Sequence, residues 1–119
     1  MRVLVVDDSS VMRKIVIRGL RQAGFKIDDV LEANDGVEAL SMLNDKGFDL
    51  ILSDWNMPNM DGLTFVKELR KSDDTPVVMI TTEGGEAKVQ EAMKCGANGH
   101  IKKPFTPDDL KATLGAFFK

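Results

Sequence analysis

The stretch Val3-Leu4-Val5-Val6-Asp7-Asp8 runs from four aliphatic residues directly into two carboxylates. Two similar stretches follow, Leu50-Ile51-Leu52-Ser53-Asp54 and Val77-Val78-Met79-Ile80-Thr81-Thr82, and a fourth, Gly99-His100-Ile101-Lys102, leads to Lys103-Pro104. Near-continuous aliphatic runs are typical of the strands of a parallel sheet that is buried on both faces. In open sheets of this kind, ligands bind outside the carboxyl ends of the strands. We therefore expect the polar residues that follow the runs to form one site.

Helical patterns alternate with these runs along the chain. The predicted strands are Arg2–Val6, a weaker one near Asp29–Glu32, Asp49–Ser53, the run from Val77, and Asn98–Lys102. The residues predicted to face inward from the five helices are Met12, Ile15, Val16, Gly19, Leu20 and Ala23, then Val37, Leu40 and Leu43, then Leu63, Val66 and Leu69, then Val89 and Met93, then Leu110, Leu114 and Phe117.

This strict alternation, with right-handed crossovers, predicts an α/β fold with helices on both faces of the sheet. We expect a flavodoxin-like, doubly wound sheet of five parallel strands in the order 2-1-3-4-5, with five helices. In that order the first and third strands are neighbours, so Asp7, Asp8 and Asp54 would meet in one crevice.

The bulk properties are those of one globular domain spanning residues 1–119. The formal net charge of −3 gives no general attraction to nucleic acid or to an anionic membrane. No apolar run is long enough to cross a membrane, and Asp7 and Asp8 interrupt any signal-like region. Cys95 is the only cysteine, so an internal disulfide is impossible. We expect a cytoplasmic monomer.

The acidic residues indicate a divalent cation. Taken singly, Asp7-Asp8 or Asp54 fits a solvated turn or a helix cap equally well. Clustered carboxylates, however, raise one another's pKa values and repel unless a cation neutralises them. Oxygen ligands suit Mg²⁺, whereas a zinc site would call for a cysteine–histidine cluster that the sequence lacks. Lys103 is either a surface lysine or, with Pro104 in a cis peptide, a cation aimed across the cluster.

As a set and in this order, these motifs resemble those of response-regulator receiver domains over the whole chain. The matching stretches are Val5-Val6-Asp7-Asp8, Ser53 to Gly62, Met79-Ile80-Thr81-Thr82 and Lys103-Pro104-Phe105. The segment Trp55-Asn56-Met57-Pro58-Asn59-Met60-Asp61-Gly62 resembles chemotaxis regulators of the CheY type in particular.

The resemblance implies that Asp54 accepts a phosphoryl group from the phosphohistidine of a histidine kinase. Asp8, Asp54 and the backbone carbonyl of Asn56 would ligate Mg²⁺, and Asp7 would act through a metal-bound water. Lys103 would neutralise charge on the transferring group. The domain would assist its own phosphorylation and dephosphorylation without turning over an external substrate, so it would not be an enzyme in the usual sense.

The resemblance also implies a switch. The hydroxyl of Thr81 would turn toward the phosphoryl group and change the surface formed by the fourth helix, the fifth strand and the fifth helix. That surface would bind a flagellar switch protein or a phosphatase. His100 stands where the family usually has an aromatic residue that moves with the threonine, and Asn56 and Glu83 match positions that tune dephosphorylation.

Other functions stay open at this stage. A single-domain phosphorelay intermediate, or a receiver cut from a larger regulator, fits the same motifs. A metal-dependent phosphohydrolase could also use an aspartyl phosphate, although Asp54 lacks a neighbouring downstream acid and no cap domain is present. A nucleotide-binding enzyme is disfavoured, because neither G-x-G-x-x-G after the first strand nor G-x-x-x-x-G-K-[ST] occurs.

Overall fold

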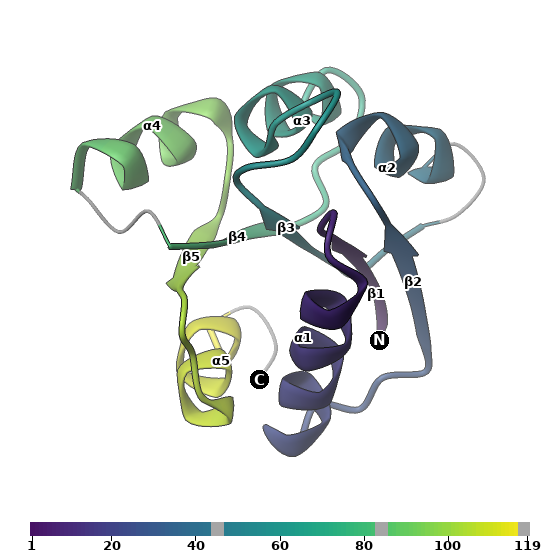
Figure 1. Cartoon of the computed structure of the whole chain (residues 1–119), viewed down its shortest axis with the longest axis vertical. Coiled ribbons are helices and arrows are strands. Elements are labelled where there is room, and N and C mark those ends of the chain that lie inside the picture. Colours follow the sequence, from purple (N-terminus) through teal and green to yellow (C-terminus); the bar gives the residue numbers. More distant parts are fainter. Residues whose placement is uncertain (44–46, 83–85, 117–119) are drawn as a thin grey trace.

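The computed structural model describes residues 1–43, 47–82 and 86–116. Strands and helices alternate strictly through these residues (Figure 1). The strands are β1 (Arg2–Val6), β2 (Asp29–Ala33), β3 (Leu50–Asp54), β4 (Val77–Thr81) and β5 (Gly99–Lys102). The helices are α1 (Ser10–Gln22), α2 (Gly36–Leu43), α3 (Gly62–Leu69), α4 (Glu86–Cys95) and α5 (Pro107–Leu114).

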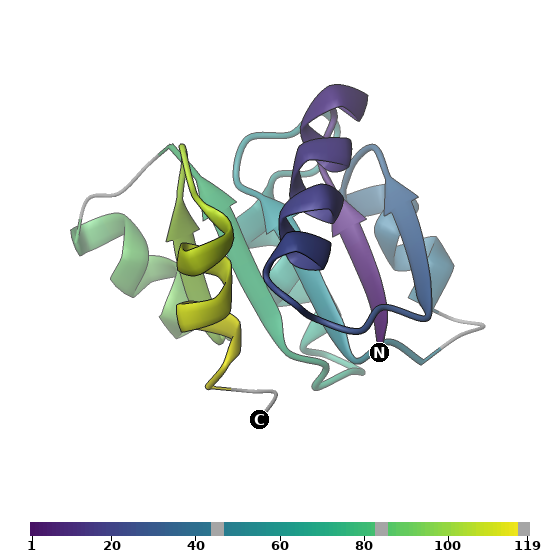
Figure 2. The same cartoon turned by 90° about the horizontal axis from the view of Figure 1, so that it is seen from below.

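The strands form one parallel sheet in the order β2-β1-β3-β4-β5, which confirms the predicted fold and strand order. Helices α2, α3 and α4 cover one face, and α1 and α5 cover the other (Figures 1 and 2). The predicted strand bounds differ from the observed ones by one residue at most: β2 extends to Ala33, β3 runs from Leu50 to Asp54, and β5 begins at Gly99.

Two hydrophobic cores lie on the two faces of the sheet. Alternate β1 residues serve different cores, because successive side chains of a strand point to opposite faces. Leu4 and Val6 pack with α2, α3 and α4, while Val3 and Val5 pack with α1 and α5. The aliphatic runs are therefore buried on both sides, as the sequence predicts.

Three predicted inward residues are wrong. Ile15, Val37 and Met93 are 47%, 52% and 44% exposed. The buried stripe of α1 is centred on Val16, Gly19 and Leu20, which leaves Ile15 on its flank. In α2 and α4 the small residues Ala39 and Ala92 take the buried positions.

Of the other residues predicted to face inward, five are half-buried and pack against the cores, namely Met12, Ala23, Leu40, Leu43 and Leu63, whereas Val89 is half-buried and is part of neither core. Val66, Leu69, Leu110 and Leu114 are buried, whereas Phe117 lies outside the described residues. Among the helices that the structure describes, none has the length and apolar character needed to span a membrane.

Candidate functional site

Three carboxylates meet at the carboxyl edge of the sheet. Asp7 follows β1, and Asp54 is the last residue of β3, the neighbouring strand in the sheet. Asp7, Asp8 and Asp54 each present a carboxylate oxygen, and these oxygens lie within 4.8 Å of one another. Asp7 is buried, Asp54 half-buried and Asp8 exposed. The predicted convergence is confirmed.

Lys103 projects into this cluster from the segment after β5. Its Nζ lies 3.2 Å from Oδ1 of Asp54 and 3.5 Å from Oδ2 of Asp7. Its backbone N–H donates to the carbonyl oxygen of Thr81 at 2.8 Å, which ties it to the end of β4. The peptide bond from Lys103 to Pro104 is cis. The interpretation of Lys103 as a cation aimed across the cluster is therefore correct.

Asp54 uses one carboxylate oxygen for contacts within the protein. Oδ1 accepts hydrogen bonds from the backbone N–H of Trp55 at 2.8 Å and from Lys103. In the part of the chain that the structure describes, no hydrogen bond is directed at Oδ2. One oxygen is held in place while the other is left for a ligand or a reaction.

Burial raises the pKa of the Asp7 carboxyl above its ordinary value of 3.8, and the negative charge of Asp54 adds to the effect. The backbone N–H of Ser9 and the ammonium of Lys103 act in the opposite direction. Burial prevails, so the ionised form of Asp7 is disfavoured even with Lys103 beside it. A clustered, all-oxygen donor set of this kind fits a hard divalent cation such as Mg²⁺.

The predicted switch residues have different surroundings. Thr81 is the last residue of β4, is 1% exposed and lies opposite Lys102 in the register. His100 is half-buried on β5, opposite Met79. Asn56 is exposed in the segment after β3. Glu83 lies outside the described residues.

Two contributions to the site escaped the sequence analysis. Arg13 on α1 donates to the backbone carbonyl oxygen of Asp7 and forms an ion pair with Glu32 at 2.9 Å. Asn59 adopts φ 67° and donates from Nδ2 to Asp35 at 2.7 Å, so the loop after β3 is tied to the start of α2. Of these two residues, only Asn59 could have been suspected from its residue type, because asparagine tolerates the left-handed backbone region.

Asp61 and Gly62 shape the start of α3 in two different ways. Asp61 caps α3 by accepting a hydrogen bond from the backbone N–H of Thr64. Gly62 is needed for space, because a Cβ there would collide with the backbone carbonyl oxygen of Asp54 and with Met79. The start of α3 therefore packs directly against the residue that ends β3.

A family model described as "Response regulator receiver domain" matches residues 3–115. The chain belongs to this family. The receiver domain is 50% identical over 118 residues to a "Chemotaxis protein CheY homolog" of Campylobacter jejuni, covering 96% of this chain and 89% of the relative. It is 48% identical to "Chemotaxis protein CheY1" of Helicobacter pylori, covering 96% and 94%.

Solved structures agree with the sequence comparisons. The chemotaxis protein CheY4 of Vibrio cholerae superposes on this receiver domain with a TM-score of 0.84 and 43% identity, covering 98% of each chain. The receiver domain of the Francisella response regulator 1452 gives a TM-score of 0.81 and 34% identity, covering 92% of this chain and 88% of the other. The resemblance to chemotaxis-type receivers is thus confirmed at the level of family and fold.

Proposed function

We propose that this receiver domain is phosphorylated on Asp54 by a histidine kinase in a Mg²⁺-dependent reaction and signals in chemotaxis. The observation that carries the proposal is the contact of Lys103 Nζ with Asp54 Oδ1 at 3.2 Å, inside a cluster of three carboxylates. A carboxylate nucleophile beside a fixed cation, at the carboxyl edge of a parallel sheet, suits transfer of an anionic phosphoryl group.

In the proposed step, Oδ2 of Asp54 attacks the phosphorus of the donor's phosphohistidine. A P–O bond forms to the carboxylate, the P–N bond breaks, and the imidazole leaves with the bonding electron pair and takes up a proton. The product is an acyl phosphate on Asp54. The Trp55 N–H and Lys103 hold Oδ1, which leaves Oδ2 oriented for the attack.

Asp8, Asp54 and the backbone carbonyl of Asn56 would hold Mg²⁺, with Asp7 acting through a bound water. When present, the ion neutralises charge on the phosphoryl oxygens. Lys103 contributes a positive charge beside Oδ1 of Asp54. Burial disfavours the ionised form of Asp7, and a bound cation would offset this by stabilising the carboxylate.

The output step begins at Thr81, whose hydroxyl turns toward the phosphoryl group on Asp54. Lys103 and Thr81 are joined through the backbone, so movement of one end of β4 reaches the segment after β5. We expect the α4-β5-α5 surface to change and to bind a flagellar switch protein or a phosphatase, with His100 as a switch residue on β5. Phosphate charge added at one site commonly drives such changes in packing.

The test is the intact mass of the protein after incubation with acetyl phosphate, with Mg²⁺ or with a chelator. One Mg²⁺-dependent, hydroxylamine-labile adduct is expected, and Asp54→Asn should abolish it. Asp74→Asn, which removes an exposed carboxylate away from the cluster, is the matched control and should label normally.

Persistent labelling of the Asp54→Asn variant at the same site, or no adduct on folded protein under any condition, would contradict the proposal. Sustained release of phosphate from added esters, in place of one slow stoichiometric cycle, would indicate a metal-dependent phosphohydrolase. Transfer of phosphate onward to a histidine phosphotransfer protein would indicate a relay intermediate.

A further inference from the structure

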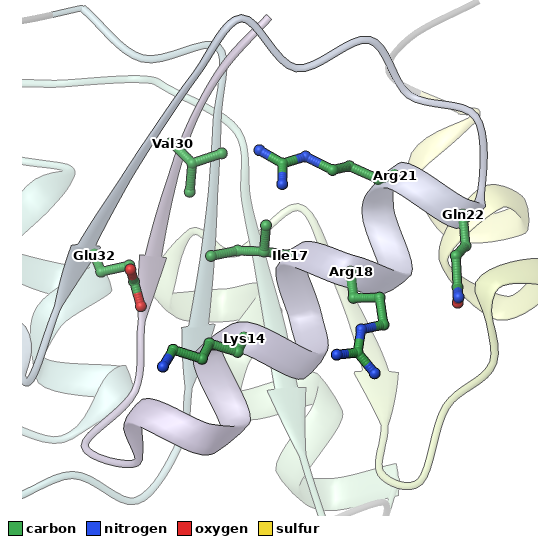
Figure 3. A pocket seen from close by; sticks show the side chains of 7 residues that line it. All are labelled: Lys14, Ile17, Arg18, Arg21, Gln22, Val30 and Glu32. Carbon is green, nitrogen blue, oxygen red and sulfur yellow. The ribbon is translucent and has the colours of Figure 1, made fainter.

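A groove of about 660 Å³ runs between α1 and the edge strand β2 (Figure 3). Lys14, Ile17 and Arg21 extend from α1 toward the strand that carries Val30 and Glu32 (Figure 3). Because β2 is at the edge of the sheet, no further strand of the described residues adjoins the groove on that side. The groove is separate from the carboxylate cluster, and none of its lining residues has a role in the proposed phosphorylation.

The charge of this groove opposes that of the whole chain. Helix α1 carries four basic side chains and no acidic one, whereas the chain as a whole has a formal net charge of −3. Lys14 and Arg21 are exposed, and among the described residues neither forms an ion pair. The acidic residue of the groove, Glu32, is already paired with Arg13. The groove therefore offers positive charge that the protein itself leaves unmatched within the described ranges.

The floor between the two cations is apolar. Ile17 and Val30 are half-buried and pack against the core on the α1–α5 face, so each still presents part of its side chain to the groove. Lys14 and Arg21 are seven residues apart on one helix, which places their backbones about 10 Å apart along the helix axis. Lys14 and Arg21 therefore lie on either side of the apolar pair, and Arg18 adds a third basic side chain to the lining of the groove.

We propose that this groove binds an acidic segment of a partner protein, which presents two carboxylates about 10 Å apart on either side of an apolar side chain. One face of a helix does this with acidic residues at positions i and i+7 and an apolar residue at i+3 or i+4. The carboxylates pair with Lys14 and Arg21, and the apolar side chain contacts Ile17 and Val30.

Nucleic acid and anionic lipid fit the groove less well. Both would bring closely spaced phosphates against Glu32, whereas the proposed segment carries only two carboxylates about 10 Å apart. A phosphate backbone also offers no apolar group for Ile17 and Val30. A protein segment supplies both kinds of contact at once.

The experiment is a titration of the ¹⁵N-labelled full chain, followed by amide chemical shifts, without Mg²⁺ or phosphodonor. The probe is a 16-residue alanine-rich helical peptide with Glu at i and i+7 and Leu at i+3. The control peptide carries Gln at both Glu positions. The test variant is Lys14→Gln with Arg21→Gln, and the matched control variant is Lys67→Gln with Lys111→Gln, which removes the same charge from exposed positions on α3 and α5.

Saturable shifts confined to α1 and β2 are expected with the Glu peptide and not with the Gln peptide. Affinity should fall about tenfold in the Lys14/Arg21 variant, stay unchanged in the Lys67/Lys111 variant, and weaken with added salt, as for exposed ion pairs. If the double variant fails to fold, the single Lys14→Gln variant should show a smaller loss in the same residues.

Three outcomes would overturn the proposal: no shifts in α1 and β2 at millimolar peptide, equal shifts with the Gln peptide, or equal weakening in both double variants. Shifts in the groove with a thymidine decanucleotide or with phosphatidylserine vesicles, but not with the Glu peptide, would also overturn it. None of these results bears on Asp54, so the experiment tests the proposed groove binding independently of the proposed phosphorylation.

Discussion

The guanidinium of Arg13 donates a hydrogen bond from Nη1 to the backbone carbonyl oxygen of Asp7 at 2.6 Å. The same nitrogen donates to Oδ1 of Asn34 at 3.1 Å, and Nε donates to Glu32 at 2.9 Å. One side chain of α1 thus joins the end of β1 to the end of β2. Because Asp7 and Asp8 directly follow β1, Arg13 holds the backbone from which both carboxylates project.

Replacing Arg13 with glutamine should loosen that backbone. We expect Mg²⁺ affinity and the rate of phosphorylation by acetyl phosphate to fall about tenfold, as is usual when a residue that orients metal ligands is removed. The free energy of unfolding should fall by about 2 kcal/mol through loss of a charge-assisted hydrogen bond. A Mg²⁺ titration with the fluorescence of Trp55 as the readout measures the change in Mg²⁺ affinity.

Arg18→Gln is the matched control, because it removes the same charge from the same helix at an exposed position. It should behave as the unmodified protein does. Equal phosphorylation rates for the Arg13 and Arg18 variants would show that Arg13 has no positioning role.

Gly62 is expected to tolerate no side chain. A Cβ at this position collides with the carbonyl oxygen of Asp54, so Gly62→Ala must move either α3 or the residue that accepts the phosphoryl group. Overpacking of this kind costs about 1–3 kcal/mol. We expect a lower midpoint of urea unfolding together with slower labelling of Asp54. In Gly47→Ala the new Cβ meets no atom within 4 Å, so this variant should change neither property.

The architecture could be predicted because its signals are local and repeated. Each aliphatic run reports a strand buried on both faces, and the alternation with helices then leaves few possible strand orders. Once β1 and β3 are neighbours, Asp7 and Asp54 must meet. For Lys103 the residues alone left a surface position open, and the resemblance to receiver domains favoured the cluster.

Exposure within helices and polar contacts between distant segments could not be predicted in the same way. Ile15 and Val16 are equally apolar, and only the sheet decides which of them is buried. Arg13 and Lys14 are neighbouring basic residues whose different directions the sequence does not show, yet one holds Asp7 while the other borders the α1–β2 groove. Gly62 reads as a turn residue, although its requirement is for space.

The raised pKa of Asp7 predicts that, in metal-free buffer, ionised Asp7 lowers the free energy of unfolding. Because the folded pKa lies above the ordinary value of 3.8, the folded state binds the proton more tightly than the unfolded chain does. The destabilisation is therefore absent below that ordinary value and develops as the pH rises through the folded pKa. Asp7→Asn should be more stable than the unmodified protein at pH 7.5, by about 1 kcal/mol, the order of a screened charge interaction.

The stability gained by Asp7→Asn should shrink as the pH is lowered from 7.5 toward 4, which urea unfolding at several pH values would measure. Asp74→Asn, at an exposed position, serves as the control and should show no such trend. A constant difference across the pH range, or a less stable Asp7→Asn variant at pH 7.5, would contradict the prediction.

Asn59 combines a backbone conformation with a hydrogen bond, and two variants separate them. Its φ of 67° lies in the left-handed region, and its Nδ2 donates to Oδ2 of Asp35. Asn59→Gly keeps the conformation and loses the hydrogen bond, whereas Asn59→Ala loses both. We expect unfolding free energies to fall from asparagine to glycine to alanine, with alanine lower by about 2 kcal/mol.

The hydrogen bond from Asn59 to Asp35 should also make the stability depend on pH. The backbone N–H of Glu38, and next the amide of Asn59, hold the pKa of Asp35 below its ordinary value of 3.8. The stability from these hydrogen bonds is present above that value and is lost as the pH falls through the folded pKa. Asn59→Gly removes the hydrogen bond from Asn59, so its stability should decline less steeply below pH 4 than that of the unmodified protein. Parallel pH profiles for the two proteins would show that Asn59 contributes through its backbone alone.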